Sequence, residues 1–87
     1  MLLAEYSKSF IKQLQKLPYR KQLHAERAIR TFCENPNTRS LRNHALKGEW
    51  SGYNSISAGG DLRLHYKVVD ENNVIFVAVG THSQLYR

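Results

Sequence analysis

A chain of 87 residues is long enough for one domain, covering residues 1–87, and its 41% hydrophobic content excludes an intrinsically disordered protein. Its 13 Lys and Arg residues outnumber its 7 Asp and Glu residues, which gives a formal net charge of +6. Such a positive surplus on a small body attracts polyanions, so nucleic acid is the first candidate partner, ahead of an anionic membrane surface or an acidic protein.

The cysteine content and the apolar runs indicate where the protein works. Cys33 is the only cysteine, which excludes an intrachain disulfide and a zinc site built from several thiolates. A single unpaired thiol is typical of a reducing compartment. No apolar run approaches the roughly 20 residues that span a bilayer, and the first residues lack the basic region of a signal peptide. We therefore expect a cytoplasmic protein that does not associate with membranes.

The N-terminal half predicts one strand followed by two helices. Leu2–Tyr6 is a short apolar run typical of a strand, and Ser7 is a candidate helix N-cap. Within residues 8–17 and 19–34, apolar side chains recur at helical spacing, so each segment predicts an amphipathic helix. Pro18 separates the two segments, which predicts a hairpin of two helices.

The C-terminal half predicts three strands. Residues 35–50 begin with a turn and show no clean period, which is typical of an irregular connection. From Gly52 the apolar pattern alternates or runs continuously in three segments separated by turn residues: 53–57, 61–68 and 74–79. Three consecutive strands predict an antiparallel meander. The order is therefore β-α-α-β-β-β, an α+β fold in which a two-helix hairpin packs on an antiparallel sheet.

The strand over residues 61–68 predicts which face of the sheet is buried. Successive side chains of a strand point to opposite faces, and here the even positions are apolar. The two helices are expected to cover this apolar face, because it must be buried somewhere. The odd positions would reach solvent or a groove on the opposite face: Asp61, Arg63 and His65.

Side chains suited to acid–base chemistry or phosphate binding gather in the second half of the chain: His44, Asp61, Arg63, His65, His82 and Tyr86. RNA cleavage without a metal needs a base for the 2′-hydroxyl proton, a cation for the charge on the phosphate, and an acid for the leaving 5′-oxygen. Histidine suits the first and last tasks because its pKa lies near neutrality. Arginine suits the second through its forked donors. From spacing alone, each of these residues could equally have an ordinary structural role.

Other chemistries fit the sequence less well. The chain has no glycine-rich phosphate loop. The candidate face offers a single carboxylate, Asp61, where a two-metal nuclease needs several. No pair of histidines has the local spacing of a zinc site. We therefore expect no metal and no cofactor.

Three segments of the chain resemble the YafQ-type toxins of the RelE/ParE superfamily. His44–Tyr53 resembles their H-x-L-x-G-x-W-x-G-Y stretch, Asp61–Val68 resembles the strand that follows, and Gly80–Tyr86 resembles their G-T/S-H-x-x-L-F ending. The resemblance covers nearly the whole chain and implies the RelE-like fold of microbial ribonucleases. It also implies the toxin of a type II toxin–antitoxin system, an mRNA interferase that cuts mRNA in the ribosomal A site and inhibits translation. A cognate antitoxin would neutralise the toxin, and the toxin would contact DNA only as part of the complex with that antitoxin.

The same resemblance assigns roles to individual residues. His44, Asp61, His82 and Tyr86 match active-site positions of the YafQ branch, and Arg63 matches an arginine of the RelE branch that contacts the scissile phosphate. On this hypothesis His82 and His44 divide the acid and base roles in 2′-hydroxyl attack, which leaves a 2′,3′-cyclic phosphate. Arg63 would stabilise the phosphate, Asp61 would orient a histidine or the 2′-hydroxyl, and Tyr86 would stack on or hydrogen-bond the substrate.

Further residues are expected to contact RNA. Ser57 stands where YafQ-type toxins often carry another histidine, and it is expected to bind substrate together with Lys47 and His65. Basic residues of the two predicted helices would anchor rRNA through phosphate contacts, which position a protein but carry no sequence information. A solvated helical face explains this basic set equally well: Lys8, Lys12, Lys16, Lys21, Arg27 and Arg30.

Two other functions fit the same superfamily. One is a ParE-type inhibitor of DNA gyrase, which carries no nuclease site. The set of histidines argues against it, because a pure binding module does not need titratable groups in this pattern. The other is a non-catalytic module that binds an antitoxin.

Overall fold

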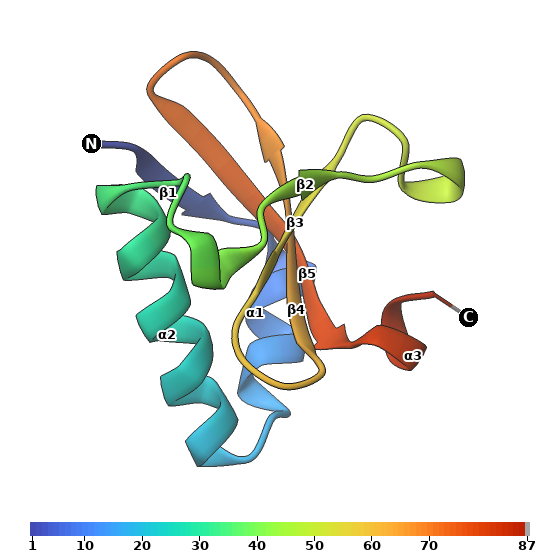
Figure 1. Cartoon of the computed structure of the whole chain (residues 1–87). Coiled ribbons are helices and arrows are strands. Elements are labelled where there is room, and N and C mark those ends of the chain that lie inside the picture. Colours follow the sequence, from blue (N-terminus) through green and yellow to red (C-terminus); the bar gives the residue numbers. More distant parts are fainter. Residues whose placement is uncertain (87) are drawn as a thin grey trace.

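The computed structural model describes residues 1–86, and its elements follow the predicted order with two additions, a short strand at residues 44–45 and a helix at residues 82–85 (Figure 1). The N-terminal half contains β1 (Leu3–Tyr6), α1 (Lys8–Gln15) and α2 (Tyr19–Glu34). The middle contains two short 3₁₀ turns, η1 (Arg39–Leu41) and η2 (Gly48–Trp50), on either side of β2 (His44–Ala45). The C-terminal half contains β3 (Asn54–Ser57), β4 (Leu62–Val68), β5 (Asn73–Thr81) and α3 (His82–Leu85).

The five strands form one sheet in the order β1-β5-β4-β3-β2. Strands β3, β4 and β5 pair antiparallel, as the predicted meander requires. Strand β1 runs parallel to β5, with Leu3 opposite Asn73, so the sheet is mixed and not wholly antiparallel. No tight turn joins β1 to β5, because the helices and the meander lie between them in sequence, so nothing forces the antiparallel direction that a hairpin imposes. The predicted α+β fold is confirmed, but the predicted antiparallel sheet is mixed, because its first strand pairs in parallel.

The helices begin and end for local reasons. The backbone N–H of Phe10 donates to Ser7 Oγ at 3.0 Å, which confirms Ser7 as the N-cap of α1. At the other end of α1 the N–H groups of Lys16 and Leu17 bond three residues back, so the helix tightens and stops at Gln15, before Pro18.

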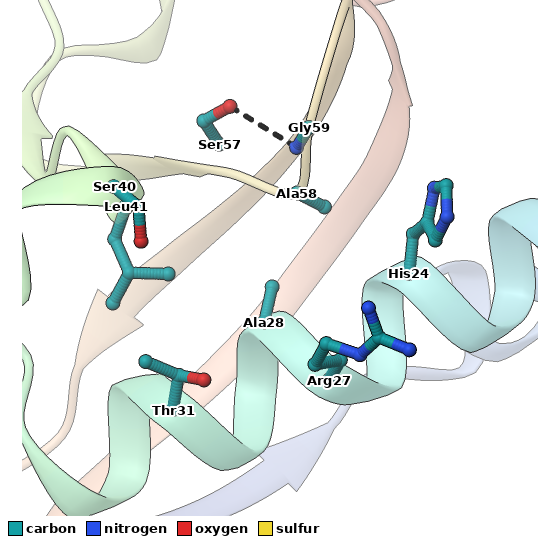
Figure 2. A pocket seen from close by; sticks show the side chains of 9 residues that line it. All are labelled: His24, Arg27, Ala28, Thr31, Ser40, Leu41, Ser57, Ala58 and Gly59. Atoms are coloured by element: carbon teal, nitrogen blue, oxygen red, sulfur yellow. Dashed lines mark hydrogen bonds between the residues drawn. The ribbon is translucent and has the colours of Figure 1, made fainter.

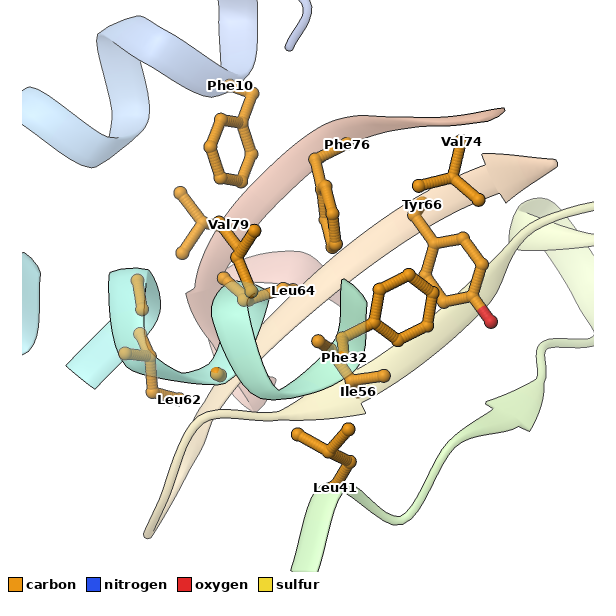
Figure 3. Packing of buried hydrophobic residues seen from close by; sticks show 13 residues of the cluster. Phe10, Phe32, Leu41, Ile56, Leu62, Leu64, Tyr66, Val74, Phe76 and Val79 are labelled. Atoms are coloured by element: carbon orange, nitrogen blue, oxygen red, sulfur yellow. The ribbon is translucent and has the colours of Figure 1, made fainter. Parts of the chain in front are cut away.

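Both helices cover one face of the sheet, as predicted, and the core lies between the two layers (Figure 3). Phe10 of α1 and Phe32 of α2 meet Phe76 of β5, with ring centroids 5.8 Å and 5.7 Å apart. Ile56 and Leu64 are fully buried in the same cluster. The opposite face of the sheet is covered by neither α1 nor α2, so polar side chains of β2, β3 and β4 that point away from the core are available on it.

The C-terminal segment forms a helix where the sequence predicts only a polar tail. Thr81 caps α3: its Oγ1 accepts from the N–H of Gln84 at 3.3 Å, and Gln84 Oε1 accepts from the N–H of Thr81 at 2.8 Å. This reciprocal pair satisfies two backbone donors and starts a helix of only four residues. Its first residue is His82, so the cap sets the place of a predicted catalytic side chain.

Candidate active site

The face of the sheet opposite the helices carries two rows of polar side chains. In one row His44 of β2, Ser55 of β3 and His65 of β4 lie side by side across the strands. In the next row Ser57 of β3 lies opposite Arg63 of β4. The alternation of strand residues therefore collects on one face side chains that are far apart in the sequence.

A cleft of about 320 Å³ lies over these rows. Its lining comes from the η1–β2 loop, from β2, β3 and β4, and from α3: Arg42, His44, Ser55, Ser57, Arg63, His82 and Tyr86. Four of the five predicted catalytic residues thus share one cleft, together with Ser57 from the predicted substrate-binding set. Arg42 and Ser55 were not predicted, because neither an irregular loop nor a serine on a short strand carries a signal for a site.

Three residues of the predicted catalytic and substrate-binding sets lie outside the lining of this cleft: Asp61, Lys47 and His65. Asp61 and Lys47 are both exposed at the surface. The backbone carbonyl of Asp61 accepts a hydrogen bond from the N–H of His82 at 3.2 Å. Asp61 therefore contacts the predicted catalytic histidine through its main chain, at the start of α3.

Arg63 is held in one orientation by three hydrogen bonds. Its Nη1 donates to Ser57 Oγ at 3.2 Å, to the carbonyl of Gly60 at 2.8 Å and to the carbonyl of Leu62 at 3.1 Å. Within the described residues all of these bonds use Nη1, so Nη2 and Nε can donate to an anion in the cleft. A guanidinium positioned in this way suits a phosphate that carries two acceptor oxygens.

His44 is oriented by the main chain of Arg42. Its Nδ1 lies 2.7 Å from the Arg42 carbonyl, which can only accept, so Nδ1 carries the proton. In the neutral ring Nε2 then holds the lone pair that a general base needs. Arg42 has a left-handed φ of 50°, an uncommon conformation for a residue with a side chain. This turn brings the Arg42 carbonyl to the imidazole.

The short helix α3 is fastened to the sheet through Trp50 and Tyr86. Trp50 Nε1 donates to the carbonyl of Leu85 at 3.0 Å, and the Trp50 ring meets the His65 ring edge to face at 4.4 Å. The Tyr86 hydroxyl lies 3.2 Å from His65 Nε2. The rings of His82 and Tyr86 have centroids 4.4 Å apart. The position of His82 therefore depends on a cluster formed by Trp50, His65 and Tyr86.

Replacing Trp50 with phenylalanine should loosen α3 without removing a group that touches substrate. The ring over His65 would remain, but the N–H that bonds to the Leu85 carbonyl would be lost. We expect the free energy of unfolding to fall by about 1 kcal/mol, the usual net worth of such a hydrogen bond. Urea titration would measure this change, and a Trp50→Phe protein as stable as the wild type would show that the bond does not hold the helix.

His65 is buried, and the prediction that it reaches solvent or a groove is wrong. Its exposed fraction is 0%, because Trp50 and Tyr86 cover it. Burial, together with the nearby His44 and His82, lowers the pKa of His65 to about 4. The ring is thus neutral near pH 7. Burial also raises the pKa of Tyr86, although Arg63 opposes the shift, so the phenol stays protonated. His65 supports the cleft from below and does not line it.

The buried imidazole predicts how stability depends on pH. The unfolded chain takes up a proton at His65 near its ordinary pKa of 6.5, whereas the folded protein resists protonation until about pH 4. The unfolded state therefore binds more protons in between, and stability falls as the pH is lowered through this window. We expect the free energy of unfolding to drop by about 2 kcal/mol from pH 7 to pH 5.

Chemical denaturation at several pH values would measure this drop, with His24→Gln as the matched control, because His24 is exposed and its loss should leave the drop intact. His65→Phe should reduce it. A wild-type protein equally stable at both pH values would contradict the burial of His65.

The basic residues of the two helices are all exposed: Lys8, Lys12, Lys16, Lys21, Arg27 and Arg30. These residues lie in the helical layer, on the face of the sheet opposite the cleft. Arg27 also lines a second cleft, which is described below. Among residues 1–86, no group of three or more His, Cys, Asp or Glu side chains is placed to hold a metal ion. In the same part of the chain, no helix is long and apolar enough to cross a membrane.

Comparison with known proteins bears on this site. Residues 2–87 match the family described as "Bacterial toxin of type II toxin-antitoxin system, YafQ". A crystal structure of YafQ from E. coli BL21(DE3) has a TM-score of 0.82 at 23% identity, with 100% of both chains covered. The solution structure of HP0894 from Helicobacter pylori, described as a conserved hypothetical protein, has a TM-score of 0.75 at 28% identity, over 98% of this chain and 99% of that one.

A complex from Mycobacterium tuberculosis, the toxin–antitoxin complex RelBE2, has a TM-score of 0.64 at 26% identity, over 93% of this chain and 98% of that one. No curated protein sequence matches the chain. The family match covers nearly all residues. It includes the His44–Tyr53 and Gly80–Tyr86 segments, which contribute residues to the lining of the cleft. The chain is therefore a member of the YafQ family of bacterial type II toxin–antitoxin toxins.

Proposed function

We propose that this toxin is an endoribonuclease that cuts mRNA by attack of a 2′-hydroxyl on the adjacent phosphate. The observation that carries the proposal is the meeting of His44, Arg63 and His82 in one cleft of about 320 Å³. A base, a phosphate-binding cation and an acid are the groups that this reaction requires. A module that only binds gyrase or an antitoxin has no need of this arrangement.

The hydrogen bond of His44 favours one division of roles. Because Nδ1 of His44 is occupied by the Arg42 carbonyl, Nε2 takes the proton from the 2′-hydroxyl. The 2′-oxygen then bonds to phosphorus while the bond from phosphorus to the 5′-oxygen breaks. Protonated His82 gives its proton to the departing 5′-oxygen. The products are a 2′,3′-cyclic phosphate and a 5′-hydroxyl, and no metal or cofactor takes part.

Arg63 and Tyr86 complete the proposed site. The Arg63 guanidinium, fixed through Nη1, donates from its remaining N–H groups to the oxygens on which negative charge builds during attack. Tyr86 stacks near His82 and keeps a protonated hydroxyl at the cleft. Ser57, which bonds Arg63, contacts the sugar-phosphate backbone in place of the histidine that related toxins often carry. Asp61 keeps His82 at the start of α3 through its main-chain carbonyl.

Membership of the family supports a proposal about the cellular setting of the reaction. We propose that the toxin acts in the cytoplasm, in the ribosomal A site, with the exposed Lys and Arg residues of α1 and α2 against rRNA phosphates. A cognate antitoxin would neutralise it, as the DinJ–YafQ complex of E. coli, at 23% identity and TM-score 0.70, suggests by analogy. The toxin would contact DNA only as part of its complex with the antitoxin.

The test is cleavage of a defined mRNA by the purified protein with ribosomes stalled on it. We expect new 5′ ends at discrete positions by primer extension, and none without the toxin. Intact mRNA in the presence of an active ribosome complex would contradict the proposal. A gyrase supercoiling assay on the same preparation then decides whether the ParE-type function holds instead.

A further inference from the structure

A second cleft lies on the other side of the sheet edge from the candidate active site. It has a volume of about 300 Å³ and opens between α2, η1 and the turn that joins β3 to β4 (Figure 2). Its polar lining comes from His24, Arg27 and Thr31 of α2, from Ser40 of η1, and from Ser57 and Gly59 at the turn. The chemistry proposed above uses none of these residues except Ser57.

The helical part of this lining is suited to an anion. His24, Arg27 and Thr31 follow at intervals of three and four residues, which places them on one face of α2. Figure 2 shows the His24 ring standing up from α2 and the Arg27 side chain running along the helix with its guanidinium toward His24. Arg27 is exposed, and no hydrogen bond within the described residues occupies its guanidinium. The hydroxyls of Thr31 and Ser40 add donors on the same side.

Ser57 connects the second cleft to the first. It lines both, and its Oγ accepts from Arg63 Nη1 at 3.2 Å and from the N–H of Gly59 at 3.3 Å. Strand β2 pairs with β3 only at Asn54 and Ser55, so no strand lies beside the outer edge of β3 at Ser57. No neighbouring strand therefore blocks a path along the surface from Arg63, around this edge of β3, to Arg27.

We propose that the second cleft binds a backbone phosphate of the RNA strand that flanks the scissile phosphate, with Arg27 as its main cation. The strand would leave the candidate active site over Ser57, cross the edge of β3 and place this phosphate against Arg27 and His24. The inference rests on the proposed function, because it takes the first cleft to hold RNA. It gives Arg27 a role distinct from the other basic residues of the helices: contact with the substrate strand and not with rRNA.

Arg30 provides a matched control. It lies on the same helix, is exposed like Arg27, carries the same charge, and does not line the cleft. Binding would be measured by fluorescence anisotropy with a short single-stranded RNA whose riboses are 2′-O-methylated, so that it cannot be cut. We expect Arg27→Ala to weaken binding roughly tenfold and to reduce the slope of log affinity against log salt by about 0.7, the value for one contact with a single strand. Arg30→Ala should change both much less.

A second measurement locates the contact along the strand. Shortening the RNA one nucleotide at a time from each end should, at one end only, bring the wild type down to the affinity of Arg27→Ala. For RNAs shorter than this length, the wild type and Arg27→Ala should bind with equal affinity. Equal losses for Arg27→Ala and Arg30→Ala at every RNA length would overturn the inference, because they indicate only the general attraction of a basic surface. It would also be overturned if Arg27→Ala impaired cleavage on ribosomes but left binding of the free RNA unchanged, since Arg27 would then contact rRNA.

The outcomes separate this inference from the proposed function. If wild-type protein cuts mRNA while Arg27→Ala and Arg30→Ala bind RNA alike, the second cleft is not a phosphate site but the nuclease proposal stands. If binding depends on Arg27 while the wild type never cuts mRNA, the second cleft binds RNA and the nuclease proposal fails.

Discussion

Replacing His82 with alanine should lower the rate of mRNA cleavage by about 10²- to 10⁴-fold, the contribution of one positioned acid or base. The imidazole of His82 lines the cleft, exposed beside the ring of Tyr86, and its removal leaves no other acid at the start of α3. Because His82 is exposed, the loss should change the free energy of unfolding little. The measurement is the rate of a single round of cleavage on stalled ribosomes, together with urea unfolding of the same preparation.

Glu71→Ala is the control for this substitution, since it removes an exposed side chain that lines neither cleft and should keep the rate of the chemical step. His82→Ala should also relieve growth arrest when the toxin is expressed without an antitoxin. Growth arrest that persists while transcripts stay intact would argue for a target other than mRNA, and gyrase activity would then be the assay to follow.

Replacing Arg63 with alanine should lower cleavage by about 10²- to 10³-fold, as expected when a donor to the developing phosphate charge is lost. The guanidinium is fixed by Ser57 and by two backbone carbonyls, so it is already oriented when substrate arrives. Arg63→Lys should restore only part of the rate, because an ammonium cannot reproduce the forked donors. If Arg63 acts mainly in the transition state, kcat falls more than KM rises.

The matched control for Arg63 is Arg30→Ala, which removes the same charge from the other face of the molecule. It separates loss of a specific donor from loss of general attraction to RNA. An Arg63→Ala protein whose KM rises while its kcat stays unchanged would assign Arg63 to substrate binding and leave the phosphate charge without a stabilising group.

The sequence predicts the two main helices and the meander because its local signals agree with one another. The helical stripes, the Ser7 cap and the alternation in β4 each identify an element that the structure contains. The parallel pairing of β1 with β5 was not predictable in this way, because it depends on where the chain returns after two helices and three strands. The helix α3 was missed because four residues are too few for a periodic signal, although Thr81 and Gln84 carry the spacing of a capping box.

The candidate site was predictable in part for a different reason. Alternation in β4 puts Arg63 on the face opposite the helices, and the cleft on that face also receives His44 and His82. The same alternation puts His65 on this face, but it cannot show that Trp50 and Tyr86 cover the ring. Arg42 enters the site through a left-handed turn in an irregular loop, which no pattern in the sequence marks. The roles of Asp61 and Lys47 stay predictions, since neither lines the cleft.

The chemistry of the cut RNA end tests the central claim most directly. An mRNA with a single 2′-deoxyribose at the preferred cleavage position would be compared with the all-ribose mRNA on stalled ribosomes, with the released 3′ ends identified by mass spectrometry. The account predicts a 2′,3′-cyclic phosphate from the ribose substrate and no cut at the deoxyribose. Cleavage of the deoxyribose substrate at an undiminished rate would contradict attack by the 2′-hydroxyl and with it the roles of His44 and His82.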